Sequence, residues 1–281
     1  MATAGLPMYD LPELHTATDA WWAGIARALR REGIQDVPES LAREHHTEKL
    51  WQIPDLLLSQ TCGYNVAGAH ASRFAYLATP CFTAPGCEGP LYSSHIVVPA
   101  TSEARTLEDL RGKRCVINGY ASHSGCNALR AAFAPFAQGG HFFASVTASG
   151  GHALSLKMLA QGEADVAAID CVVYALLARC RPQAVEGART IGQTPSAPVG
   201  PYVARAGASD DAVARLRNGL LRAIDDPDLA QAREALFIGG LAILNPEDYD
   251  RIQQIEAEAM RLGYQDFAQP CLLYVQQRVV K

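Results

Sequence analysis

The sequence predicts an α/β fold made of two lobes, and three features of the chain predict it. Short apolar runs alternate with amphipathic stretches, as they do where helices pack against a sheet. The pattern changes after Ala100, where strand-then-helix units follow one another closely. A segment rich in proline and glycine, residues 194–202, ends that block. The length of 281 residues suits one large lobe or two medium lobes.

The first lobe begins with a strand predicted at residues 4–9 and a helix that follows it. Thr16, with Asp19 three residues later, resembles a capping box at the start of that helix. Gly33 resembles the glycine that ends a helix. A continuous apolar centre predicts a buried parallel strand at residues 55–59. Two more strands are predicted at residues 74–79 and 95–98.

The block after Ala100 consists of three strand-then-helix units and a last strand, and it is self-contained. Its apolar runs are short enough for strands, and each is followed by a helical pattern. The strands are predicted at residues 115–118, 142–146, 165–169 and 188–192, and the helices at 125–137, 152–161 and 171–180.

Three further helices are predicted downstream. Ser209 caps the first of them. Asn245, followed by proline and two acidic residues, begins the last one. Its inner face is formed by Tyr249, Ile252, Ile255 and Ala259.

These elements divide the chain into one lobe inserted into another. Residues 1–99 and 194–281 form lobe one, and residues 100–193 form lobe two. Extended crossings around Val98 and Thr194 join them. Ligands of α/β sheets bind outside the carboxyl ends of parallel strands, so we expect a ligand cleft between the lobes.

Composition excludes several classes of function. A net charge of −5 disfavours nucleic acid as a partner. No apolar run approaches the roughly 18 residues of a membrane-spanning helix. The first ten residues lack the basic flank and apolar stretch of an export signal, so we expect a cytoplasmic protein, or a periplasmic one if a leader was removed. The eight cysteines include no C-x-x-C pair, which argues against a zinc ribbon or a thiol redox pair.

Small hydroxyl residues and glycine follow several predicted strands. A hydroxyl group next to a glycine at a helix start leaves backbone N–H groups exposed, and these can bind a phosphate, phosphonate, sulfonate or carboxylate without lysine or arginine. The same residues are also ordinary helix caps. The turns span residues 60–64, 122–125 and 149–152.

The turn at residues 122–125 stands out among these turns because two hydroxyls and a glycine converge within four residues. Its members are Ser122, His123, Ser124 and Gly125. Ser149 opens the third turn, which also carries a histidine. Three turns of one type in a two-lobed chain favour an anion site over three unrelated caps.

Asp170 and the tyrosines are further candidates for ligand contact. Asp170 ends an apolar strand, where it could cap the following helix or accept hydrogen bonds from a ligand. Tyr9, Tyr64, Tyr92 and Tyr202 fall near strand ends or crossings, where a tyrosine offers an apolar wall and one hydroxyl. Each of them could equally belong to the core or the rim.

The histidines form no metal-binding pattern. His45 and His46 lie in a charged, solvated stretch. His123 and His152 each stand beside a predicted anion turn, where either could donate a hydrogen bond to an oxyanion or bond only to its own backbone. Cys62 could be an activated thiolate, but nothing in the sequence pairs it with a histidine. We therefore expect no metal and no cofactor.

Several segments taken together resemble a known family. Their order and spacing over residues 4–205 are more specific than any single motif. The segments are Tyr92-Ser-Ser-His-Ile-Val-Val, Leu107-Glu-Asp-Leu-Arg-Gly-Lys-Arg, Ser122-His-Ser-Gly, Ser149-Gly-Gly-His and Gly162-Glu-Ala-Asp-Val-Ala-Ala-Ile-Asp. The chain resembles the substrate-binding proteins of phosphate/phosphonate ABC transporters.

The resemblance implies a type II periplasmic-binding-protein fold whose lobes close on a small anionic ligand, with an ABC permease as a partner. The hydroxyl-rich turn that grips the phosphonate group corresponds to Ser122, His123 and Ser124. The aspartate at the end of a second-lobe strand corresponds to Asp170. A first-lobe aromatic residue of the site falls at Tyr9 or Tyr64.

One departure from the family bears on the ligand. Family members that hold an aminoalkyl phosphonate resemble Gly-Ser-His-Glu, where this chain has Gly150-Gly-His-Ala. The missing acid removes a partner for an ammonium group, so we expect a ligand other than an aminophosphonate.

The sequence therefore leaves three classes of function. The first is a non-catalytic binding protein for phosphate, phosphite or a phosphonate. The second is a cytosolic enzyme on the same fold, for which His123, His152, Cys62 and Asp170 are the acid–base or nucleophilic candidates. The third is an effector sensor that docks onto a regulator.

Overall fold

A computed structural model describes residues 2–44 and 47–265, so His45 and His46 lie outside the described residues. The chain forms two compact units, each of which contains helices and a five-stranded sheet. Within the described ranges, the first unit comprises residues 2–83, 87–91 and 198–250, and the second comprises 84–86, 92–197 and 251–265. The α/β class predicted from the sequence is confirmed.

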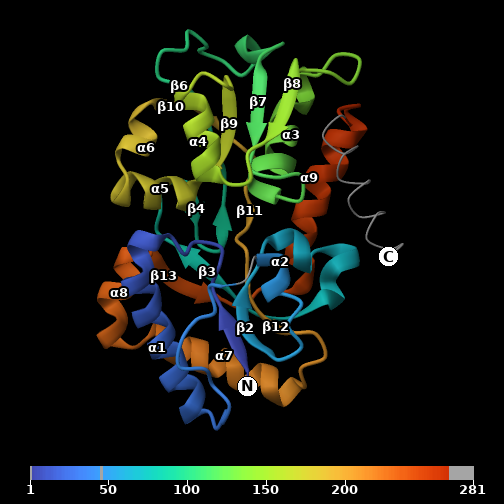
Figure 1. Cartoon of the computed structure of the whole chain (residues 1–281). Coiled ribbons are helices and arrows are strands. Elements are labelled where there is room, and N and C mark those ends of the chain that lie inside the picture. The colour runs from blue at the N-terminus through green and yellow to red at the C-terminus, as the bar shows by residue number, and fades with distance from the viewer. Residues whose placement is uncertain (1, 45–46, 266–281) are drawn as a thin grey trace. The chain divides into compact units, whose positions relative to one another are not determined.

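The sheet of the first unit has the order β1-β2-β12-β3-β13 (Figure 1). The two strands at one edge, β1 and β2, are parallel, whereas β12 is antiparallel to both β2 and β3. The strands are β1 (Thr3–Gly5), β2 (Leu56–Gln60), β3 (Phe74–Phe82), β12 (Tyr202–Arg205) and β13 (Ile238–Ala242), and the helices are α1 (His15–Arg31), α2 (Thr47–Leu50), α7 (Asp210–Ile224) and α8 (Ala230–Ala235).

Helix α1 packs closely on its neighbours in the first unit. A Cβ added to Gly24 would lie 2.1 Å from Leu229 Cδ1, and one added to Gly219 would lie 2.4 Å from Leu29 Cδ2, so both glycines allow close approach. The predicted capping box at Thr16 is wrong, because α1 begins at His15, directly after the 3₁₀ turn Pro12–Leu14. Gly33 does follow the helix, with φ of +82°.

The sheet of the second unit has the order β10-β6-β9-β7-β8. The three strands on one side of this sheet are parallel, because β7 is parallel to both β8 and β9, whereas β6 is antiparallel to β9 and β10. The strands are β6 (Ser94–Pro99), β7 (Arg114–Ile117), β8 (Ser145–Ala148), β9 (Val166–Asp170) and β10 (Ala188–Gln193), and the helices are α3 (Ala128–Phe133), α4 (His152–Ala160), α5 (Cys171–Cys180), α6 (Gln183–Glu186) and α9 (Asp250–Arg261).

The core of the second unit explains one wrong strand prediction. The run that begins at Phe142 was predicted to be a strand, but β8 begins only at Ser145. Phe142 is instead buried in an aromatic cluster, with its ring centroid 4.9 Å from those of Phe133 and Phe143. The apolar residues that imitate a strand therefore anchor the core beside a short, largely exposed edge strand.

The chain passes between the units near a small sheet of order β11-β5-β4, made of β4 (Cys87–Glu88), β5 (Leu91–Tyr92) and β11 (Ala197–Pro198). These passages lie at residues 83–84, 86–87, 91–92 and 197–198, whereas Val98, predicted to lie in a crossing, is a buried residue of β6. A further passage at residues 250–251 groups most of α9 with the second unit, a boundary that differs from the predicted lobe of 194–281.

Helix α9 starts as the sequence predicts and packs within the second unit. Asn245 and Asp248 form a capping box before it. Ile252, Ile255 and Ala259 are buried, and α9 runs beside α3 (Figure 1). None of the helices within the described ranges has the length and apolar character needed to cross a membrane.

Candidate functional site

The parallel strands of the second unit bring most of the predicted site residues to one edge of the sheet. Strands β7, β8 and β9 run in the same direction, so their carboxyl ends lie on the same side. Asn118 follows β7, Ser149 follows β8, and Asp170 is the last residue of β9. This edge is where ligands of α/β sheets bind.

The turn after β7 has an unusual backbone geometry. Ser122 is extended and caps a π-helical turn, His123–Asn127, by accepting a hydrogen bond at Oγ from the Gly125 N–H, with the two atoms 3.2 Å apart. The Oγ atoms of Ser122 and Ser124 lie 3.4 Å apart. π-helical turns are rare and are frequent at functional sites. The two hydroxyls predicted to act together therefore do lie together.

His152 connects the third predicted turn to this one. It is the first residue of α4, and its Nε2 lies 3.0 Å from Ser124 Oγ. A Cβ on Gly125 would lie 2.1 Å from Asn118 Oδ1 and 3.1 Å from His152 Cε1, so glycine allows the close approach of these side chains. Asn118, Ser124, Gly125 and His152 thus form one packed cluster.

His123 and His152 are both neutral at neutral pH. Burial lowers the pKa of His123 to about 3, and the nearby Arg251 charge lowers it further in the same direction. Burial lowers the pKa of His152 to about 4, and the Ala168 backbone opposes that shift only partly. The turn therefore offers hydroxyl, imidazole and backbone donors rather than a positive charge.

Ser149 is engaged by its own turn. Its Oγ lies 2.8 Å from Ser155 Oγ, 2.9 Å from the Gly151 carbonyl oxygen and 3.2 Å from the Ile117 carbonyl oxygen. These contacts fix the loop that places His152 against Ser124. A ligand contact by Ser149 itself stays a prediction.

Asp170 caps α5, one of the two roles that the sequence allows. It is 3% exposed, and its Oδ1 accepts hydrogen bonds from the N–H groups of Val172 and Val173 at 2.8 and 3.2 Å. Ser94 lies opposite Asp170 in the antiparallel pairing of β6 and β9. The buried Ser94 Oγ has no hydrogen-bond partner among the described residues. This hydroxyl adds a polar group that the sequence did not single out.

The predicted tyrosines divide between the two units. Tyr92 is buried in the second unit, where its ring centroid lies 6.2 Å from that of His123. Tyr9 belongs to the first unit and packs edge-on against Phe82 at 4.9 Å. Tyr64 is partly buried in the 3₁₀ turn Gly63–Val66, also in the first unit.

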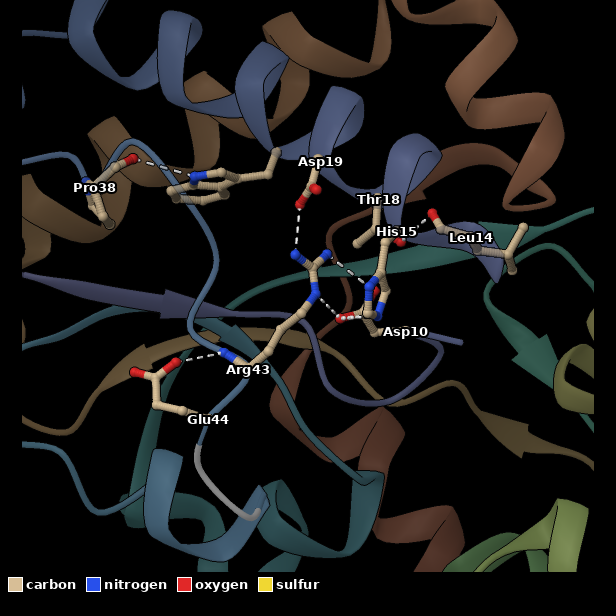
Figure 2. Close-up of polar contacts among 9 residues, drawn as sticks. Asp10, Leu14, His15, Thr18, Asp19, Pro38, Arg43 and Glu44 are labelled. Carbon is tan, nitrogen blue, oxygen red and sulfur yellow. Dashed lines mark hydrogen bonds and ion pairs between the residues drawn. The ribbon is translucent and has the colours of Figure 1, made fainter. Parts of the chain in front are cut away.

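Asp10, the residue after Tyr9, belongs to a charged cluster in the first unit (Figure 2). Arg43 Nε lies 2.6 Å from Asp10 Oδ2, and its NH1 lies 2.8 Å from Asp19 Oδ1. His15 Nε2 also approaches Asp10, at 3.8 Å. These bonds raise the pKa of Arg43 and tie the chain after β1 to α1.

An open hollow of about 870 Å³ lies elsewhere on the second unit, among residues 99–104, Lys113, 159–165 and Gly187. Lys113 and Asp165 precede β7 and β9, so the hollow marks the amino ends of these strands. Asp165, which lines the hollow, is ion-paired with Arg114. We therefore assign the candidate site to the opposite, carboxyl edge.

Sequence reasoning missed Asn127 and Arg130. Both residues are 2% exposed. Asn127 contacts His123, and Arg130 contacts Asn127. Their partners on α9 lie more than a hundred positions away in the chain, so local spacing carries no signal of these contacts.

The chain has the two-lobed α/β fold of periplasmic binding proteins. The family described as "ABC transporter, phosphonate, periplasmic substrate-binding protein" matches residues 44–249. The chain belongs to this family of ABC-transporter substrate-binding components, and the family is periplasmic. No curated protein matches the chain significantly.

Solved structures show the same fold at low sequence identity. A binding protein component of an ABC phosphonate transporter from Pseudomonas aeruginosa has a TM-score of 0.72 at 15% identity, covering 99% of this chain and 97% of its own. PhnD1 from Prochlorococcus marinus, in complex with methylphosphonate, has a TM-score of 0.70 at 15% identity, with 94% and 98% covered. A Xanthomonas citri protein bound to ATP has a TM-score of 0.65 at 18% identity, with 93% and 97% covered.

Proposed function

We propose that this protein captures a small oxyanion, namely phosphate, phosphite or a phosphonate other than an aminophosphonate, and delivers it to an ABC permease. The observation that carries the proposal is the π-helical turn at the carboxyl end of β7, where Ser122, Ser124 and His152 converge. Membership of a periplasmic family favours the periplasm as the place of action and a binding protein over an enzyme.

The donors at this turn suit a compact anion. Serine hydroxyls and a neutral imidazole give hydrogen bonds to oxyanion oxygens without an opposite charge, so the ligand can be released again. The lowered pKa values of His123, to about 3, and His152, to about 4, are consistent with neutral donors. Asp170 and the tyrosines Tyr9, Tyr64 and Tyr92 would contact the rest of the ligand.

Capture would proceed by closure of the two units on the ligand. The chain passes between the units at residues 91–92 and 197–198, and these short crossings would absorb the change in backbone angles. The permease would then recognise the closed form. PhnD1, a fold relative, is known in complex with methylphosphonate, which supports a ligand of this size.

The test replaces Ser122 and Ser124 singly by alanine. Each Ser→Ala change should weaken binding of methylphosphonate and inorganic phosphate by about 1–3 kcal/mol, because a buried hydrogen-bond partner is lost. Isothermal titration calorimetry measures the change. Ser145→Ala, on the exposed strand β8, is the matched control and should leave affinity unchanged. Unchanged affinity in both site variants would contradict the proposed site.

The ligand itself can be found by thermal shift. A panel of phosphate, phosphite, methylphosphonate, an aminoalkylphosphonate, sulfate and acetate should single out one of the first three. A ligand present at 100 times its Kd stabilises the folded protein by about 2.7 kcal/mol. Stabilisation by the aminoalkylphosphonate alone, or by acetate alone, would overturn the proposed ligand class.

A further inference from the structure

Three side chains connect α9 to the His123 turn in the second unit. Asn127 Nδ2 lies 3.1 Å from His123 Nδ1 and 3.1 Å from the Ile252 carbonyl oxygen. Arg130 NH2 lies 3.1 Å from Asn127 Oδ1 and 3.3 Å from Glu256 Oε1. The result is a continuous chain of contacts, which we call the α9 relay: Glu256, Arg130, Asn127, His123.

The contacts fix the orientation of the Asn127 amide. The guanidinium of Arg130 can only donate, so the atom it faces must be the amide oxygen. The Ile252 carbonyl can only accept, so the atom it faces must be the amide nitrogen. A flipped amide would set donor against donor and acceptor against acceptor at these two contacts.

The amide orientation in turn fixes the proton of His123. Asn127 Nδ2 has two hydrogens, and at 3.1 Å from His123 Nδ1 it can only donate there, so Nδ1 accepts with its lone pair. A neutral imidazole carries one proton, and here it must sit on Nε2. His123 is 2% exposed, so water does not compete with this arrangement.

Arg130 and Glu256 hold the amide in place. Arg130 is 2% exposed, and a buried guanidinium needs its partners because leaving it unpaired is costly. Glu256 supplies the opposite charge from α9, and its side chain is 35% exposed. Removing the Glu256 charge therefore loosens Arg130, then Asn127, and then the preference of His123 for one tautomer.

We propose that the α9 relay keeps the His123 proton on Nε2, so that this histidine serves the anion turn as an N–H donor and never as an acceptor. The role of His123 toward an anion rests on the proposed function, whereas the position of the proton does not. Asn127, Arg130 and Glu256 are positioning residues for that donor.

The direct test is long-range ¹⁵N–¹H correlation NMR of the histidine rings in the full chain at pH 7. His123 should show a protonated Nε2 and an unprotonated Nδ1. A protonated Nδ1, or a mixture of both tautomers, would overturn the proposal. No variant is needed, so loss of folding cannot obscure the result.

Two variants test the relay itself. Asn127→Asp sets an acceptor against Nδ1 and should move that nitrogen to the protonated form. Glu256→Gln should turn the single tautomer into a detectable mixture, whereas Glu258→Gln, which removes an exposed partner of Arg261 on the same helix, should not. An Nδ1 that stays unprotonated in Asn127→Asp, or equal spectra for Glu256→Gln and Glu258→Gln, would contradict the relay.

Affinity for methylphosphonate separates the relay from the proposed function. Glu256→Gln should weaken binding several-fold in parallel with the tautomer change, whereas Glu258→Gln should not. A fixed tautomer in the wild type together with unchanged affinity in the Ser122→Ala and Ser124→Ala variants would uphold the relay and reject the anion site.

Discussion

The two units hold polar groups at the carboxyl ends of their parallel strands in different ways. In the second unit, neutral groups of Ser122, Ser124 and His152 contact one another across adjacent strands and turns. In the first unit, the corresponding position after β1 holds an ion-paired carboxylate, Asp10, beside an aromatic residue, Tyr9. The same sheet edge thus supports a neutral donor cluster in one unit and a charge-neutralised, aromatic one in the other.

This difference gives the two sheet edges different electrostatic character. Neutral donors can bind and release an anion, whereas in the first unit the Arg43 cation is already paired with the carboxylates of Asp10 and Asp19. Under the proposed function, the contacts to the anion would come from the second unit. The predictions below test that contrast.

The largest expected effect is on pH-dependent stability and belongs to the second unit. In the unfolded chain a histidine takes up a proton near pH 6.5, whereas the folded pKa is lowered to about 3 for His123 and about 4 for His152. Because the folded state binds fewer protons, the free energy of unfolding falls as the pH drops from about 7 toward 4. The fall is up to about 1.4 kcal/mol per pH unit for each histidine.

Urea denaturation at a series of pH values measures this slope. The double variant His123→Gln, His152→Gln should have a shallower slope than the wild type between pH 7 and 4. Equal slopes would mean that the two imidazoles are not withdrawn from solvent as the structure indicates.

The next largest effect comes from the packing around Gly125. Gly125→Ala places a methyl group 2.1 Å from Asn118 Oδ1 and 3.1 Å from His152 Cε1, so these side chains or the turn must shift, at a cost of about 1–3 kcal/mol in stability. Binding of methylphosphonate should be lost with it, because Ser122 and Ser124 move. Gly119→Ala is the control, since a Cβ there meets nothing within 4 Å. Calorimetry that finds wild-type affinity in Gly125→Ala would break the contrast.

The smallest effect on ligand affinity should come from the charged cluster of the first unit. Arg43→Met leaves Asp10, whose side chain is 9% exposed, without its cation and should lower the free energy of unfolding by about 1–3 kcal/mol. Arg261→Met breaks an exposed pair with Glu258 and should change it by less than about 0.5 kcal/mol. Affinity for methylphosphonate should be unchanged in both variants. A large loss of affinity in Arg43→Met would mean that the first unit contributes to binding of the anion.

Local patterns predicted much of the second unit. Helix α5 spans Cys171–Cys180, as predicted, because a continuous apolar strand ending in Asp170 marks both the strand end and the cap. The position of Ser122 and Ser124 at the start of a helical turn was also predicted, because helix starts have a recognisable composition. Features of this kind depend on neighbours in the chain.

Features that depend on distant contacts were not predictable. The π-helical turn exists where Gly125 packs on Asn118 and His152, and no spacing rule encodes that contact. Asn127 and Arg130 look like ordinary polar helix residues until Ile252 and Glu256 are placed against them. The strand predicted to begin at Phe142 is wrong, because this side chain packs on the rings of Phe133 and Phe143.

The passage of the chain at residues 250–251 has a practical consequence for protein engineering. A graft that transfers only residues 92–197 into a homologous scaffold would bring Arg130 without Glu256 and Asn127 without the Ile252 carbonyl. A chimera that exchanges the second unit must therefore transfer two separate segments together, residues 92–197 and the helix beyond residue 250.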